Sequence, residues 1–140
     1  MPAPILHIDS CKRLFEKFKL RKASLNFALV TVGSVLTDLE EFGVVRGLHW
    51  KGEAFLNYLL RTDPKYAPLA IGMIMHEEMD KTLDKHYVEP NVPRAERILK
   101  KFNIRMFKRE GHYFLDHVMT CSLVKEKPGL VKVAEAAKKR

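Results

Sequence analysis

A histidine and an aspartate stand four positions apart in an apolar segment, and this spacing is the first feature that could carry chemistry. In "LAIGMIMHEEMDKTLDKHY", residues 69–87, they are His76 and Asp80. On a helix the two share a face, so the imidazole N–H could donate to the carboxylate, or both groups could bind one metal ion. The zinc-protease pattern HExxH is absent, because no second histidine follows His76 at the fourth position. The alternative is a satisfied polar pair within the core.

The helical surroundings of His76 favour that structural alternative. A helical wheel places it on one face with five neighbours, while Glu77, Glu78, Lys81 and Lys85 lie elsewhere; the neighbours are Leu69, Met73, Asp80, Leu83 and Tyr87. Polar groups buried on an apolar face are normally hydrogen-bonded. We therefore predict a core residue, with no metal and no cofactor. The other histidines show no ligand spacing and are expected to be ordinary: His7, His49, His86, His112 and His117.

The periodicity of apolar residues predicts a mainly α-helical single domain over residues 1–140, with a basic N-terminal arm or helix (1–23), a core (24–126) and a basic tail (127–140). The expected helices cover 11–22 after a cap at Asp9 or Ser10, then Ser24 to Gly43, 48–61, 68 onward, 93–110 and 128–140. Residues 112–124 fit a helix or a strand, and we favour the helix. No internal repeat is visible. Trp50, Phe55 and Tyr58 are expected in the core.

The net charge of +8 is distributed unevenly along the 140 residues. Residues 1–30 carry six Lys/Arg and two acids, residues 31–90 carry six and ten, and residues 91–140 carry thirteen and five. Basic residues segregated into segments indicate a polyanionic partner, most often nucleic acid. A solvated basic surface is the alternative interpretation.

One basic cluster has helical spacing. Arg94, Arg97, Lys101, Arg105 and Lys108 follow one another at intervals of 3, 4, 4 and 3 residues. On one helix they would form a cationic stripe beside an apolar one, and each could meet a different phosphate. We therefore predict that the basic helix near the N-terminus, this stripe and the tail bind nucleic acid; the residues are Lys12, Arg13, Lys17, Lys19, Arg21, Lys22, Arg94, Arg97, Lys101, Arg105, Lys108, Lys132, Lys138, Lys139 and Arg140.

Several classes of protein are not favoured by the sequence. No apolar run approaches the roughly 20 residues of a membrane span, and no secretion signal is recognisable at the N-terminus. The two cysteines, Cys11 and Cys121, make neither a disulfide framework nor a zinc cluster. They could pair with each other, although two buried thiols are the simpler expectation.

The segment "IGMIMHEEMDKTL" resembles the Gly-x-x-x-His helix of RecB-like nucleases of the PD-(D/E)xK class, and most of all the CRISPR-associated exonuclease of that class. "DSCKRLFEKFKLRK" is similar to the earlier cysteine-bearing basic segment of that family. The resemblance, which covers roughly residues 8–120, implies that "GHYFLDHV" is a strand with Asp116 at the catalytic position. The family's Glu-x-Lys strand, Gln-x-x-x-Tyr helix and cysteine trio are absent, and "KEK" at 125–127 has the wrong order.

This truncated pattern is similar to the major capsid proteins of filamentous viruses of hyperthermophilic archaea, the tristromavirus group. The resemblance implies a helical fold, a heterodimer with a second related capsid protein, and wrapping of linear double-stranded DNA, held in A-form, into a nucleocapsid inside a lipid envelope. It also implies a virion location, with assembly in the host cytoplasm.

Three functions are therefore weighed. The first is a non-enzymatic DNA-packaging protein, the second a degraded nuclease or nuclease accessory, and the third a small DNA-binding regulator or chromatin protein. A nuclease requires several carboxylates and a lysine converging on the phosphate. A regulator requires a recognition helix with side chains that read bases. The cations found here are of the phosphate-binding kind, which favours packaging.

Overall fold

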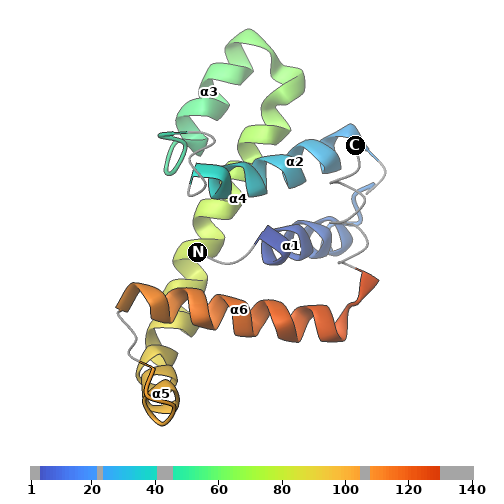
Figure 1. The fold of residues 1–140 in the computed structure, drawn as a ribbon. Helices are drawn as coiled ribbons and strands as arrows, with labels where there is room; N and C mark the ends of the chain where they lie inside the picture. The colour runs from blue at the N-terminus through green and yellow to red at the C-terminus, as the bar shows by residue number, and fades with distance from the viewer. Residues whose placement is uncertain (1–3, 22–23, 41–45, 105–107, 130–140) are drawn as a thin grey trace. The chain divides into compact units, whose positions relative to one another are not determined.

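The computed structural model describes residues 4–21, 24–40, 46–104 and 108–129. Within these ranges the chain forms six α-helices and short helical turns and no strand, so the predicted mainly α-helical fold is confirmed (Figure 1). The α-helices are α1 (Pro4–Lys17), α2 (Leu25–Leu36), α3 (Gly52–Thr62), α4 (Ala67–Leu83), α5 (Glu89–Lys100) and α6 (Lys108–Glu126).

Contacts divide the chain into two compact units, each described here by itself. The N-unit is His7–Met79, and the C-unit combines Met1–Leu6 with Asp80–Arg140. This division differs from the predicted arm, core and tail. Helix α1 is packed into the N-unit, because Cys11 and Phe15 on its inner face are 0% and 5% exposed. The predicted last helix, 128–140, lies almost entirely outside the described residues.

Helix α1 begins at Pro4, so the predicted cap at Asp9 or Ser10 is wrong. Proline is favoured in the first turn of a helix, where its missing N–H is not needed. Asp9 lies inside the helix and is buried, and its carboxylate accepts a hydrogen bond from Arg13 Nε at 2.6 Å. The predicted cap of α2 is confirmed, since the Ser24 side chain accepts from the Phe27 N–H at 3.2 Å.

The core of the N-unit forms where α1, α2 and α4 meet. Cys11, Phe15 and Val30 are buried there, and Phe27 and Met75 pack against them. Figure 1 shows α2 crossing α4. At the crossing a Cβ added to Gly33 would lie 1.9 Å from the Leu69 carbonyl oxygen, and one added to Gly72 would lie 2.1 Å from the Val30 carbonyl oxygen. Glycine is therefore required at both positions, because the two backbones touch.

Helix α3 begins at Gly52, later than predicted. The residues before it are not helical, because their backbone N–H groups bond to the side chain of Glu40. Glu40, at the end of the 3₁₀ turn Thr37–Glu40, accepts hydrogen bonds from the backbone N–H groups of Gly47, Leu48 and His49 at 2.6, 3.1 and 3.0 Å. The first N–H of α3, on Gly52, donates to Glu77 Oε1 at 2.9 Å. Glu77 therefore caps α3. Glu77 was expected to lie away from the core, and this prediction is wrong because its side chain is buried.

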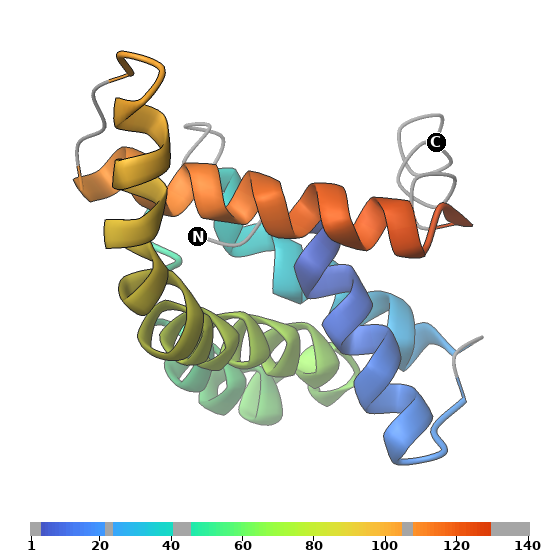
Figure 2. The same ribbon diagram turned by 90° about the horizontal axis from the view of Figure 1, so that it is seen from below.

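In the C-unit, α5 packs against α6 (Figure 2, gold and orange). Val88, Ala95 and Leu115 are buried at the centre, with four half-buried neighbours: Tyr87, Val92, Phe114 and Met119. A π-helical turn, Asp84–Val88, precedes α5. Its wider backbone suits Pro90, which has no N–H to donate and would clash with the carbonyl four residues earlier in a regular helix.

The predicted helix over 93–110 is wrong in its extent. Helix α5 starts at Glu89, contains Pro93 and ends at Lys100, and a new helix begins at Lys108. Asn103 adopts a left-handed conformation with φ of 57°, which ends the helical path. The prediction followed the apolar periodicity, which runs on past this end.

Candidate functional site

His76 lies at the centre of the N-unit, as predicted. Its side chain is 0% exposed. Its Nδ1 atom is 2.8 Å from the carbonyl oxygen of Ser34 on α2. Because a carbonyl can only accept, Nδ1 carries the proton and donates it. One turn further along α4, Asp80 is also buried.

Two further histidines gather around His76, although both were expected to be ordinary. The ring of His7 on α1 stacks on His76 with centroids 4.0 Å apart and planes inclined by 21°. His49 meets His76 edge to face at 5.5 Å. The Nε2 atom of His7, which is 1% exposed, lies 3.9 Å from Asp38 Oδ2. A helix start at Pro4 would have indicated that His7 is buried, since it places His7 one turn before Cys11 on the same face.

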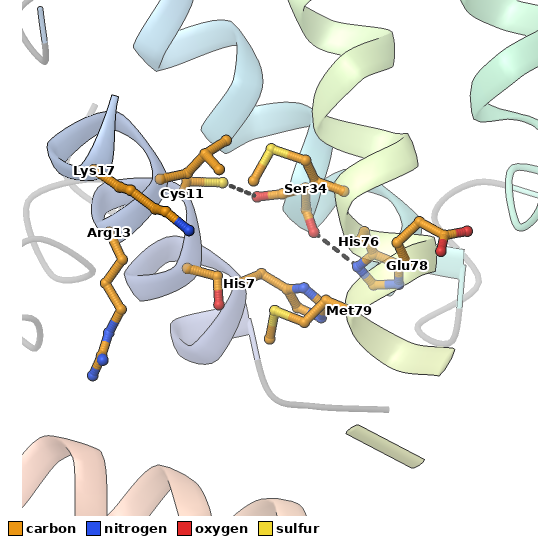
Figure 3. A pocket seen from close by; sticks show the side chains of 11 residues that line it. His7, Cys11, Arg13, Lys17, Ser34, His76, Glu78 and Met79 are labelled. Carbon is orange, nitrogen blue, oxygen red and sulfur yellow. Dashed lines mark hydrogen bonds between the residues drawn. The ribbon is translucent and has the colours of Figure 1, made fainter. Parts of the chain in front are cut away.

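A cavity of about 360 Å³ adjoins the stacked rings. Cys11, Ser34, Met75 and Met79 line it, together with the two imidazoles. Figure 3 shows Lys17 extending its ammonium group toward the cavity, whereas Arg13 points away from it.

Cys11 is not activated as a nucleophile. Its thiol donates to Ser34 Oγ at 3.3 Å, and Ser34 in turn donates to the Thr31 carbonyl at 2.8 Å. Burial raises the pKa of the Cys11 thiol, which outweighs the opposing effect of the Ser34 hydrogen bond. Since the thiolate is the reactive form of cysteine, a raised pKa makes this side chain unreactive. Cys11 is therefore a packing residue in the wall of this cavity. Cys121 is exposed and both cysteines are free, so the expectation of two buried thiols fails for Cys121.

The predicted basic residues of the N-unit are gathered at the end of α1. Lys12 is half-buried, while Arg13, Lys17, Lys19 and Arg21 are exposed. The guanidinium of Arg13 is paired with Asp9 at 2.6 Å. The remaining member of the group, Lys22, lies outside the described residues.

The predicted cationic stripe over 94–108 is not a single stripe. Arg94 and Arg97 are exposed on α5, and Lys101 is exposed immediately after it. Lys108 is the first residue of α6. The left-handed Asn103 between them breaks the helical register that would have aligned the five side chains. The predicted residues Arg105, Lys132, Lys138, Lys139 and Arg140 lie outside the described part of the chain.

The strand implied by the nuclease resemblance is also wrong, because residues 111–118 lie within helix α6. This helix carries Asp116, whose side chain is not described. Two of the three aromatic residues that were expected in the core are exposed. Trp50 is 54% exposed and Tyr58 is 60% exposed, and only Phe55 is partly covered.

No family model, curated protein or solved structure matches the chain. Among the described residues no helix has both the length and the apolar character needed to cross a membrane.

Proposed function

We propose that the protein is a structural, non-enzymatic nucleocapsid protein that binds linear double-stranded DNA without sequence preference and wraps it in a helical filament with a second, related capsid chain. The observation that supports this most is the grouping of exposed cations at the ends of two helices. Residues 12–21 carry five Lys/Arg and one acid, and residues 94–104 carry four and one. Ordinary protein surfaces mix the two signs, so such segments fit a polyanion.

The types of side chain at these helix ends support sequence-independent binding. Lysine and arginine reach phosphates, which position a protein on DNA without reading its sequence. Two asparagines in the same region have other roles. Asn91 donates to the Tyr87 carbonyl at 2.7 Å, and Asn103 forms the end of α5. A base-reading regulator would need an exposed helix face on which amides and arginines together are placed to meet base edges.

Exposed apolar side chains support assembly with neighbouring subunits. Leu25 and Val32 on α2, and Leu60 on α3, each have more than half of their surface exposed. Where such side chains form a contiguous apolar patch, the patch marks a place where another molecule packs. A filament of repeated subunits would cover them.

A degraded nuclease is the second candidate function, and its sequence elements are incomplete. Its two main sequence elements are absent, and its aspartate-bearing segment is helical. His76, the residue that suggested it, is engaged with the Ser34 carbonyl and with His7.

The test is to mix purified protein with linear duplexes of unrelated sequence, to image the products by cryo-electron microscopy and to measure the saturating ratio of protein to DNA. We expect filaments with a fixed mass of protein per length of DNA, whatever the sequence. Binding to discrete sites would instead identify a regulator. Cleavage of the DNA in the presence of Mg²⁺ or Mn²⁺ would identify a nuclease.

A further inference from the structure

Helices α1 and α5 end in similar short sequences. Residues 13–21 read RLFEKFKLR and residues 97–105 read RILKKFNIR. Four positions are identical and three more are apolar in both copies. The identical pairs are Arg13 and Arg97, Lys17 and Lys101, Phe18 and Phe102, and Arg21 and Arg105. We call each copy a cap element.

Both cap elements form the same helix end. In the first, the Leu20 N–H donates to the Phe15 carbonyl at 2.8 Å and the Lys19 N–H donates to the Glu16 carbonyl at 3.1 Å. In the second, Ile104 donates to the Leu99 carbonyl and Asn103 to the Lys100 carbonyl, both at 3.1 Å. This pair of bonds around a left-handed residue defines the Schellman motif. The left-handed residues have φ of 53° at Lys19 and 57° at Asn103.

Each cap element exposes an aromatic side chain that the motif does not require. Phe18 is 60% exposed and Phe102 is 70% exposed. The apolar residue two positions later, Leu20 or Ile104, is 50% or 52% exposed. A Schellman motif needs an apolar contact back to its own helix, but not a phenylalanine in water at the helix end. Because the arrangement occurs once in each unit, a shared contact with a partner explains it better than chance does.

The charges around the two phenylalanines indicate the nature of that partner. A lysine directly precedes each one, and an arginine follows three positions later. Lys17, Arg21 and Lys101 are exposed. In both cap elements a cation, an aromatic side chain and a second cation follow in the same order. This order matches duplex DNA, in which charged phosphates lie outside a stack of apolar base faces. An anionic bilayer would accept a larger apolar face than one aromatic and one or two aliphatic side chains.

We propose that Phe18 and Phe102 insert as wedges between base pairs of duplex DNA while the adjacent Lys17, Arg21 and Lys101 hold the flanking phosphates. Proteins that deform DNA insert phenylalanine, leucine or isoleucine between base steps in this way, next to cations. The proposal rests on the proposed DNA binding and adds a mode of contact to it. A wedge unwinds the duplex at its point of entry, whereas phosphate contacts alone need not.

The experiment relaxes closed circular duplex DNA with a topoisomerase in the presence of the full-length protein and measures the change in linking number. The wild type should unwind the DNA in proportion to the bound protein. The double variant Phe18→Ala/Phe102→Ala should lose the unwinding, and each substitution should weaken duplex affinity about fivefold or more. The dependence of affinity on salt should not change, because no cation is removed.

Tyr58→Ala is the matched control, since Tyr58 is 60% exposed on α3 and lies outside the cap elements. It should behave as the wild type. Equal thermal melting of all variants shows that the fold is intact.

Three outcomes overturn the proposal. If the double variant binds and unwinds duplex like the wild type, the wedge is wrong and DNA binding stands. If the wild type does not bind duplex at all, the proposed function fails first. If the double variant loses sedimentation with phosphatidylglycerol vesicles but keeps its DNA affinity, the cap elements contact membranes instead.

Discussion

The imidazole rings of His7 and His76 lie stacked, 4.0 Å apart between centroids, in the interior of the N-unit. Helix α1 supplies one ring and α4 the other, and the Ser34 carbonyl of α2 fixes the second through a hydrogen bond of 2.8 Å. The stack therefore links three helices. Its loss leaves both a void and a carbonyl without its donor, two defects that add to each other.

His76→Ala should destabilise the protein by roughly 1–3 kcal/mol, as expected for a buried hydrogen-bonded group. The matched control is His86→Ala, since His86 is exposed on the π-helical turn, and it should change stability little. The measurement is chemical denaturation followed by circular dichroism. An unchanged midpoint in His76→Ala, together with the loss of a bound metal, would show that the cluster is a metal site rather than a packing element.

Glu77→Ala should lower the free energy of unfolding by about 0.5–2 kcal/mol, the range for removal of a helix cap. The Glu77 carboxylate accepts from the first N–H of α3, on Gly52, at 2.9 Å. The adjacent Glu78 is exposed, so Glu78→Ala is the control. Hydrogen exchange at the N-terminus of α3 should quicken only in the first variant. Equal effects of the two substitutions would contradict the capping role.

Gly33→Ala and Gly72→Ala should each cost about 3 kcal/mol or more, because the added methyl group meets backbone rather than a movable side chain. Gly33 faces the Leu69 carbonyl and Gly72 faces the Val30 carbonyl. Gly129→Ala is the control, since nothing lies within 4 Å of the added carbon there. Thermal melting distinguishes them. A melting temperature for Gly33→Ala close to that of the control would mean that α2 and α4 do not cross so closely.

Part of this structure follows from sequence and part does not. The Ser24 cap and the burial of His76 depend on local pattern, namely a serine before an apolar run and a polar residue on an apolar face. Glu77 lies off that face on a helical wheel, yet it is buried because the start of α3 arrives there. Such a placement is set by the packing of distant segments, which local periodicity does not record.

The predicted cationic stripe failed for a different reason: its local pattern is regular, but the backbone that carries it is not one continuous helix. Its spacing is regular from Arg94 to Lys108, and the apolar pattern gives no sign of a break. One backbone conformation, at Asn103, decides the outcome. Asparagine tolerates left-handed geometry better than most residues, so Asn103 itself indicates that a helix could end there. Comparison with residues 13–21 strengthens this signal, because a similar sequence ends α1 with a left-handed residue at Lys19.

Glu40→Gln should alter how stability depends on pH. Hydrogen bonds from the backbone N–H groups of His49 and Gly47 lower the pKa of Glu40 from 4.5 to about 2. A carboxylate with a depressed pKa stabilises the fold fully above its unfolded value and loses that contribution as the pH falls. The difference in melting temperature between wild type and variant should therefore be constant above about pH 4.5 and shrink toward pH 2. A difference that stays constant to pH 2 would mean that the carboxylate does not bind the 47–49 segment.

The last prediction concerns the cations at the end of α1. Lys17→Ala/Lys19→Ala/Arg21→Ala removes three exposed charges and should reduce the log–log dependence of DNA affinity on salt by roughly 2–3 units, because each neutralised phosphate releases about one counterion. Fluorescence anisotropy with a short duplex, repeated over a range of salt concentrations, measures this slope.

The control for that variant is Lys51→Ala/Lys85→Ala, which removes exposed lysines outside both cap elements. Its slope should match that of the wild type. Because the side chains of Lys17, Lys19 and Arg21 are exposed, both variants should melt as the wild type does. If the two variants lose the same slope per charge removed, DNA attraction arises from net charge alone, and the end of α1 is not a binding surface.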